Sequence, residues 1–265
     1  MRRRTKEMET LAVEVPARSS PTEVLRVLRA MWPVTIEEPL IRFGSGGDGG
    51  YLLTKEATEI TGLFSPGVGD EAGFEEFFVG RGIDCFLADG SVEQPPFSSP
   101  RIHFLKKHLG DGADNFSISI NSWIDSSVDK QQQDLGLQMD IEGAEYHVLT
   151  NLSASDLMRF RFLVIEFHDL HKLVNRSFRE NLERILGAIA VGHEVVHAHA
   201  NNATPAVRYR NLAIPPTLEL VAIRSDIITV TGHHARLPHP LDRKNLPHRR
   251  DWVFKVPTIP TKDML

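Results

Sequence analysis

Short apolar runs alternate with amphipathic segments along the middle of the chain. Seven runs have the length and composition of buried strands, at residues 62–65, 84–88, 101–105, 135–141, 161–168, 193–199 and 217–224. Four segments between them have the pattern of helices, at residues 71–81, 119–126, 143–151 and 176–190. Strands and helices in alternation predict an α/β fold, a doubly wound Rossmann-like sheet that is mostly parallel.

Other patterns flank this alternating region. Pro21 opens an amphipathic helix that Pro33 stops. Residues 41–43 and 51–53, on both sides of the glycine-rich residues 44–50, predict a short hairpin or a strand that precedes the main sheet. The glycine-rich residues are either a flexible loop over a ligand or a plain turn. The connection 199–217 holds three prolines and no helical pattern, so the last strand can run antiparallel.

These patterns divide the chain into three segments. They are an N-terminal helical extension (1–43), a main domain (44–231) and a tail rich in His, Pro and Arg (232–265). The histidines of the tail are irregularly spaced among prolines, so we interpret it as a solvated extension rather than a metal site. Trp252 and its apolar neighbours could pin the tail to the surface.

Composition narrows the functional classes. The chain of 265 residues is 41% hydrophobic with a net charge of −5, which argues against broad electrostatic binding of nucleic acid. No run approaches the roughly 20 apolar residues that span a bilayer, so we expect a cytoplasmic protein with no membrane partner. Cys85 is the only cysteine, which excludes an internal disulfide and a thiolate zinc site. Nothing in the sequence indicates an oligomeric state.

The first predicted strand runs into a glycine turn with Gly67, Gly69 and Gly73. Glycines allow a ligand to approach the backbone closely, and the following helix offers free N–H groups. Asp89 follows the next strand about 20 residues later, the offset at which a carboxylate accepts hydrogen bonds from a ribose. The pattern therefore predicts a site for a cofactor that contains a nucleoside.

The details of the turn disfavour a dinucleotide. The glycines are spaced one residue wider than in the dinucleotide fingerprint. Asp70 and Glu71 would repel a phosphate at the start of the helix. A cofactor without phosphates, such as S-adenosylmethionine, fits better.

Charged residues end two further strands. Asp140 falls at the carboxyl end of strand 135–141, and Glu166 and His168 share a face at the end of strand 161–168. Parallel strands lie about 5 Å apart, so these side chains could converge on one cavity. They could act as a general base with an orienting acid, or as ligands of a divalent ion. Alternatively, Glu166 and His168 pair with each other or with backbone groups.

A third polar cluster follows the strand that contains His197. His199 and Asn201 could hydrogen-bond a polyol, whereas His197 alone is more simply explained as a structural residue. Glu219 enters an apolar strand and needs a partner there. We expect that partner to be His199 or Asn201.

With these motifs placed, the chain resembles the class I S-adenosylmethionine-dependent methyltransferases, in particular the FkbM-type and related small-molecule or sugar O-methyltransferases. The matching motifs are DGGYLL (48–53), FSPGVGDEAGFE (64–75), FLADG (86–90), MDIEGAEYHVL (139–149), VIEFHDLH (164–171), HANN (199–202) and IPPTLELVAIR (214–224). The resemblance implies a seven-stranded sheet with one antiparallel strand. It also implies methyl transfer from S-adenosylmethionine to a small-molecule hydroxyl, on a sugar or secondary metabolite.

The resemblance also implies roles for individual residues. The expected cofactor-binding residues are Ser65, Gly67, Gly69, Glu75, Asp89, Gly90 and Ser91. The expected catalytic residues are Asp140, His168 and His199, with one of the histidines as base. If Mg²⁺ or Mn²⁺ takes part, its expected ligands are Asp140, Glu166 and His168.

One position departs from the class I pattern. Many class I methyltransferases have an acidic residue where this chain has Ser65, so Asp70, Glu71 or Glu75 could take its place. Two other functional classes stay open: an oxidoreductase that uses a nicotinamide cofactor, and a binding module that keeps the fold without the chemistry. An RNA 2′-O-methyltransferase fits poorly with the acidic charge.

Overall fold

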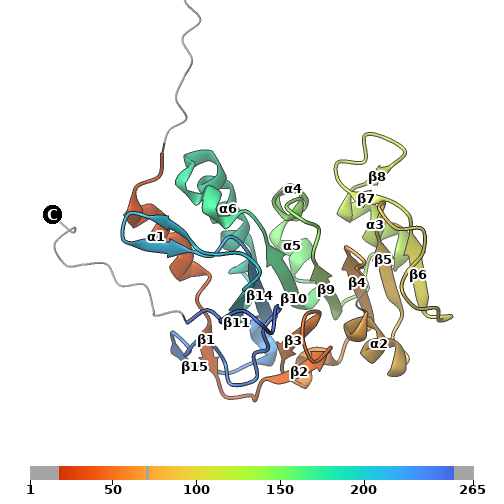
Figure 1. Cartoon of the computed structure of the whole chain (residues 1–265). Helices are drawn as coiled ribbons and strands as arrows, with labels where there is room; N and C mark the ends of the chain where they lie inside the picture. The colour runs from red at the N-terminus through yellow and green to blue at the C-terminus, as the bar shows by residue number, and fades with distance from the viewer. Residues whose placement is uncertain (1–17, 70–71, 254–265) are drawn as a thin grey trace, which may run out of the picture.

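A seven-stranded sheet forms the centre of the protein (Figure 1). The computed structural model describes residues 18–69 and 72–253; residues 1–17, Asp70 and Glu71 therefore lie outside the described residues. The strand order is β11-β14-β10-β9-β4-β5-β6. In that order the strands are His193–Ala200, Leu218–Arg224, Phe160–Phe167, Leu135–Met139, Gly62–Pro66, Cys85–Ala88 and Ile102–Leu105.

Strand directions confirm the predicted Rossmann-like fold. β4 pairs in parallel with β5 and β9, and β10 pairs in parallel with β9. β14 alone runs against its two neighbours, β10 and β11. The chain reaches β14 through a small hairpin, β12 (Val207–Tyr209) and β13 (Leu212–Ile214), instead of a crossover helix. This route lets the strand enter the sheet in the reverse direction.

Five of the six helices among the described residues lie in the predicted segments, with bounds that differ by one to a few residues, and α5 (Ala154–Leu157) was not predicted. The others are α1 (Pro21–Ala30), α2 (Gly73–Gly80), α3 (Ile120–Ser127), α4 (Glu145–Thr150) and α6 (Arg176–Ile189). Local chemistry sets several helix starts. Ser20 and Glu23 form a capping box at α1, and the side chain of Asn175 caps α6. Short 3-10 turns lie at Glu56–Thr58, Leu170–Val174 and Ser225–Ile227.

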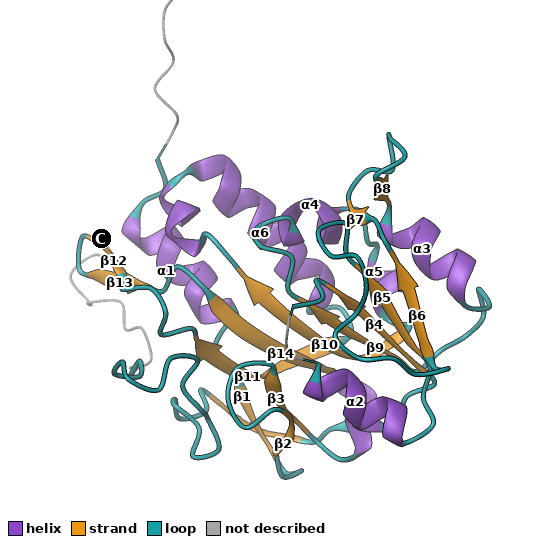
Figure 2. Ribbon diagram, turned by 45° about the vertical axis from the view of Figure 1, so that its right-hand side comes forward, coloured by secondary structure: helices purple, strands orange, loops and turns teal. Residues whose placement is uncertain are grey.

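Alternation along the strands sorts side chains into two cores. Leu137 and Met139 of β9 face a large core that α1 and α3–α6 cover. Gln138, between them, faces the other side, where Val164 of β10 packs against Phe74 of α2 and its neighbours. Figure 2 shows α2 on its own side of the sheet, away from α4, α5 and α6. The polar ends of the strands described below belong to the side of α2.

Small two-stranded sheets complete the fold. β2 (Ile41–Gly44) and β3 (Gly50–Leu53) form an antiparallel hairpin around the glycine-rich turn, which is one of the two predicted alternatives. The sequence did not indicate β7 (His108–Leu109) with β8 (Ser117–Ile118), or β1 (Val34–Ile36) with β15 (Val230–His233). β15 crosses the predicted boundary between residues 231 and 232. The division of the chain into an N-terminal extension, a main domain and a tail stays a prediction.

The part of the tail that the structure describes packs on the sheet. Leu237 is buried in the large core, and His197 on β11 contacts Asp242 at 2.8 Å between Nε2 and Oδ1. The indole of Trp252 donates a hydrogen bond to the carbonyl of Asn201. A solvated extension is therefore wrong for residues 237–252, although Trp252 does fix the segment to the surface. Among the described residues, no helix combines the length and apolar character needed to cross a bilayer.

Candidate functional site

The glycine turn occupies the carboxyl edge of the sheet, between β5 and β9. The N–H of Gly67 donates to the carbonyl of Ala88, and the N–H of Asp140 donates to the carbonyl of Pro66. Gly67 has φ +88°, and a Cβ there would lie 1.6 Å from the carbonyl oxygen of Asp140. Because no side chain fits at this crossing, glycine is required by space as well as by backbone conformation.

Asp89 faces the glycine turn. Its Oδ2 accepts a hydrogen bond from the N–H of Val68 at 2.9 Å, and its Oδ1 accepts from the N–H and hydroxyl of Ser91. Burial raises the pKa of Asp89, but these hydrogen bonds outweigh it and lower the pKa below the ordinary value. A carboxylate has about four lone-pair positions, so one remains on Oδ2 for a ligand hydroxyl. Gly90 packs on the ring of His108, where a Cβ would lie 2.4 Å from Cδ2.

A cavity of about 160 Å³ lies between the turn and the hairpin β2–β3. Predicted residues that line it are Gly67, Gly69, Glu75 and Asp140. Other lining residues, among them Tyr51 and Gln138, were not predicted. The cavity therefore connects the glycine turn to the charged end of β9.

Ser65 and Glu75 meet at the inner wall of this cavity. The Ser65 hydroxyl contacts Oε1 of Glu75 and Oε1 of Gln138, and Nε2 of Gln138 donates to the Tyr51 hydroxyl at 3.1 Å. Burial raises the pKa of Glu75, and the hydrogen bond with Ser65 opposes that effect only in part. These four side chains form one buried hydrogen-bonded chain.

His168 is held by a buried carboxylate that the sequence interpretation had not placed in the site. Glu145, at the start of α4, is fully buried and accepts hydrogen bonds through Oε1 from the N–H groups of Ile141 and Gly143. The same oxygen lies 2.9 Å from Nδ1 of His168. A carboxylate at this distance fixes the proton on Nδ1, which leaves Nε2 to face the cavity side.

Nε2 of His168 faces two carboxylates. Its distances are 3.8 Å to Oδ1 of Asp140 and 3.4 Å to Oε2 of Glu142. Burial lowers the pKa of His168, but the hydrogen bond to Glu145 and the charges of the three carboxylates outweigh it and raise the pKa. Glu142, which contacts Nε2, and Asp169, which follows His168 in sequence, both have positive φ. Such strained backbone is common at functional sites.

The expected metal ligands do not all lie in one group. Among the described residues, the side chains whose ligand atoms lie within 4.8 Å of one another are Asp140, Glu142 and His168. Glu166 instead shares a hydrogen bond with Asp140. Burial and the neighbouring charges of Asp140 and Glu219 raise the pKa of Glu166 to about 10, so Glu166 is the proton donor. A protonated carboxyl is a poor metal ligand, because ligands must give up their protons.

A row of polar residues continues across β10, β14 and β11. Glu166, Glu219 and His199 are aligned on adjacent strands. As expected, His199 is a partner of Glu219, with 3.6 Å between Nδ1 and Oε2, whereas Asn201 donates to Glu166. Asn245 from the tail also donates to Glu219, at 2.8 Å. The tail therefore closes the site beside β14.

His199, like His168, lies between carboxylates. Its Nδ1 faces Glu219, and its Nε2 lies 3.3 Å from Oδ1 of Asp251. Burial lowers its pKa, but the carboxylates of Glu219, Asp242 and Asp251 outweigh it and raise the pKa to about 9. Because its pKa is about 9, His199 is an imidazolium at neutral pH and has no free lone pair for a base.

The sequence contains signals for some of the site residues that were not predicted. Gln138 shares the face of Asp140 by simple alternation, and Glu142 directly follows the strand end. Glu145 lies in the first turn of its helix, where an acidic residue is favourable for the helix dipole alone, so its position gives no signal for the site. Tyr51 and Asn245 come from segments far away in the sequence, and no local pattern points to them.

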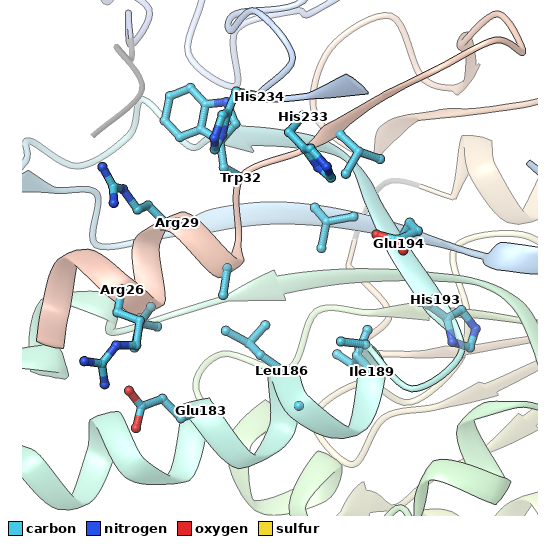
Figure 3. A pocket seen from close by; sticks show the side chains of 16 residues that line it. Arg26, Arg29, Trp32, Glu183, Leu186, Ile189, His193, Glu194, His233 and His234 are labelled. Carbon is cyan, nitrogen blue, oxygen red and sulfur yellow. The ribbon is translucent and has the colours of Figure 1, made fainter. Parts of the chain in front are cut away.

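A wider groove of about 740 Å³ lies elsewhere, where α1, α6, β11 and β15 meet. Figure 3 shows Arg26, Arg29 and Trp32 on one side of it and Glu183 and Leu186 of α6 on another. None of the predicted site residues lines this groove. The predicted site therefore lies at the smaller cavity, which the glycine turn and Asp140 line and which His168 adjoins through Asp140.

The sheet order, its single reversed strand and the polar carboxyl edge define the class I methyltransferase fold. The Methyltransferase FkbM domain matches residues 38–202, more than half of the chain. The chain belongs to this family of class I methyltransferases. No curated protein matches the sequence. The matched region holds the glycine turn, Asp140 and His168, whereas Glu219 and Asn245 lie beyond it.

Proposed function

We propose that this methyltransferase transfers a methyl group from S-adenosylmethionine to a hydroxyl group of a small molecule, either a sugar or another secondary metabolite. The observation that carries the proposal is the glycine turn with Asp89 on one side and the Glu145–His168 pair on the other. The first arrangement suits an adenosine ribose. The second suits removal of a proton from a hydroxyl.

The residues predicted to bind the cofactor form one half of the proposed site. Gly67 and Gly69 allow close approach at the carboxyl edge, and the free position on Asp89 Oδ2 would accept a ribose hydroxyl. Gly90 and Ser91 shape the turn that aims Asp89. When bound, S-adenosylmethionine would supply an already activated methyl group, so correct positioning provides much of the rate acceleration.

The acceptor half centres on His168. Glu145 holds the imidazole so that Nε2 points at the space beside Asp140, where a hydroxyl would be placed for in-line attack. Nε2 would take the hydroxyl proton as the oxygen attacks. Asp140, with its buried Oδ1 free of hydrogen-bond partners, would orient that hydroxyl. The carboxyl and amide groups of Glu166, Glu219 and Asn245 would bind further hydroxyls of a polyol.

The pKa shift of His168 gives a pH dependence. Below its pKa the imidazolium cannot accept a proton, so turnover should rise with pH. Because the pKa is raised above the ordinary 6.5, the rise should extend to a higher pH than that of an unperturbed histidine. A profile of kcat from about pH 5 to pH 9 tests this, and a profile already level at the ordinary histidine pKa would contradict it.

A divalent ion at Asp140, Glu142 and His168 is the alternative to a metal-free base. These residues could hold an ion that lowers the pKa of the acceptor hydroxyl. Glu142 is 86% exposed, however, and Glu166 is protonated. We therefore expect that dialysis against EDTA leaves turnover unchanged. A loss that Mn²⁺ restores would assign the three side chains to an ion.

Calorimetry distinguishes the proposal from its two rivals. We expect the purified chain to bind S-adenosylhomocysteine saturably and NADH not at all. Saturable binding of NADH alone would instead favour the oxidoreductase. A chain that binds S-adenosylhomocysteine but transfers no tritiated methyl group to any of a panel of monosaccharides and phenols would favour a binding module.

A further inference from the structure

The buried carboxyl group of Glu75 on α2 lies beside Ser65 on β4, a strand that has no acidic residue at this end. Glu75 is 7% exposed, lines the cavity at the glycine turn and contacts the hydroxyl of Ser65 at the end of β4. Many class I methyltransferases have an acid at the position of Ser65. In this chain the helix therefore brings a carboxyl group to the place that the strand leaves uncharged.

The hydrogen bonds around Glu75 indicate its protonation state. Gln138 donates through Nε2 to Tyr51, so its Oε1 is the atom that faces Ser65. The Ser65 hydroxyl has one proton but contacts two acceptor oxygens, Oε1 of Gln138 and Oε1 of Glu75. If Ser65 donates to Gln138, Glu75 must donate to Ser65. Glu75 is then a neutral acid before the cofactor binds, which avoids a buried unpaired charge.

We infer that Glu75 is the carboxyl group that binds the α-ammonium of the cofactor's methionine part, replacing the acid absent at Ser65. The inference rests on the proposed function. Asp89 would hold the ribose on the β5 side of the turn, so the amino-acid part would extend toward β4 and Glu75. On binding, Glu75 releases its proton to solvent, and the carboxylate accepts a charge-assisted hydrogen bond from the ammonium.

The variant Glu75→Gln tests this assignment directly. Glutamine is neutral and can donate N–H to Ser65, so the thermal stability of the empty protein should not change. Its affinity for S-adenosylhomocysteine should fall by about 10- to 100-fold, the range for losing a hydrogen bond to a charged group. Its affinity for 5′-methylthioadenosine, which lacks the amino-acid part, should match that of the wild type. Glu76→Gln, a neutral change at the exposed neighbour, is the control.

A relocated carboxyl group provides the second test. Glu75→Ala combined with Ser65→Asp should regain most of the affinity for S-adenosylhomocysteine that Glu75→Ala alone loses. Unchanged binding of S-adenosylhomocysteine to Glu75→Gln would overturn the inference, as would equal losses for both ligands. Wild-type protein that binds neither ligand would refute the proposed function instead, so the two failures can be distinguished.

Discussion

Replacing His168 with glutamine should lower methyl-transfer turnover by about 10²- to 10⁴-fold, the usual contribution of a general base. The affinity for S-adenosylhomocysteine should stay near that of the wild type, because His168 lies beside Asp140 and Glu142 and not among the residues that line the cofactor cavity. Transfer of a tritiated methyl group to the acceptor and calorimetry measure the two quantities on the same preparation.

The matched control is His147→Gln. His147 is exposed on α4, two residues after Glu145. This variant should keep wild-type turnover. Equal turnover of His168→Gln and wild type would contradict the role of His168 as base, and a large loss of cofactor affinity in His168→Gln would instead assign the side chain to the cofactor site.

Replacing Gly67 with alanine should abolish cofactor binding and destabilise the fold. The added Cβ would lie 1.6 Å from the carbonyl oxygen of Asp140, and φ is +88°. Strain in this backbone region and displacement of a packed main chain each cost about 1–3 kcal/mol. We expect the free energy of unfolding in urea to fall by about 2–5 kcal/mol, with no detectable binding of S-adenosylhomocysteine.

A second glycine provides the control for this variant. Gly187 lies inside α6, and a Cβ there meets nothing within 4 Å. Gly187→Ala should therefore keep cofactor binding and stabilise the protein by about 0.5–1 kcal/mol, the gain for alanine over glycine in a helix. A stable Gly67→Ala variant that binds the cofactor normally would show that the turn is not the cofactor site.

Most of the fold was predictable because its signals are local. The strands of the main sheet are apolar runs, and the helices carry amphipathic patterns and capping residues such as Ser20 and Asn175. The reversed strand β14 followed from a connection with prolines and no helix. In contrast, the pairing of β1 with β15 joins segments about 200 residues apart, and no local pattern specifies such a partner.

The candidate site was predictable where strand ends carry charge. Asp140 and His168 follow from the rule that ligands bind at the carboxyl ends of parallel strands. The division of roles between His168 and His199 did not follow, because it depends on the carboxylate beside each nitrogen. Glu145 and Asp251, which decide it, can be placed only by the three-dimensional structure.

The tail shows where compositional reasoning fails. A segment rich in His, Pro and Arg is typical of a solvated extension. Here two histidines of β11 provide partners for its acids, since His197 pairs with Asp242 and His199 with Asp251. Asn245 then reaches both Asp48 of the glycine-rich hairpin turn and Glu219. Side-chain contacts between distant segments offset the absence of regular structure in the tail.

A crystal structure of the wild-type chain with S-adenosylhomocysteine tests the central claim most directly. The account predicts the adenosine at the glycine turn, with a ribose hydroxyl hydrogen-bonded to Asp89 and the sulfur directed toward His168. Density for the ligand in the groove between α1 and α6, with the turn at Gly67 empty, would contradict it.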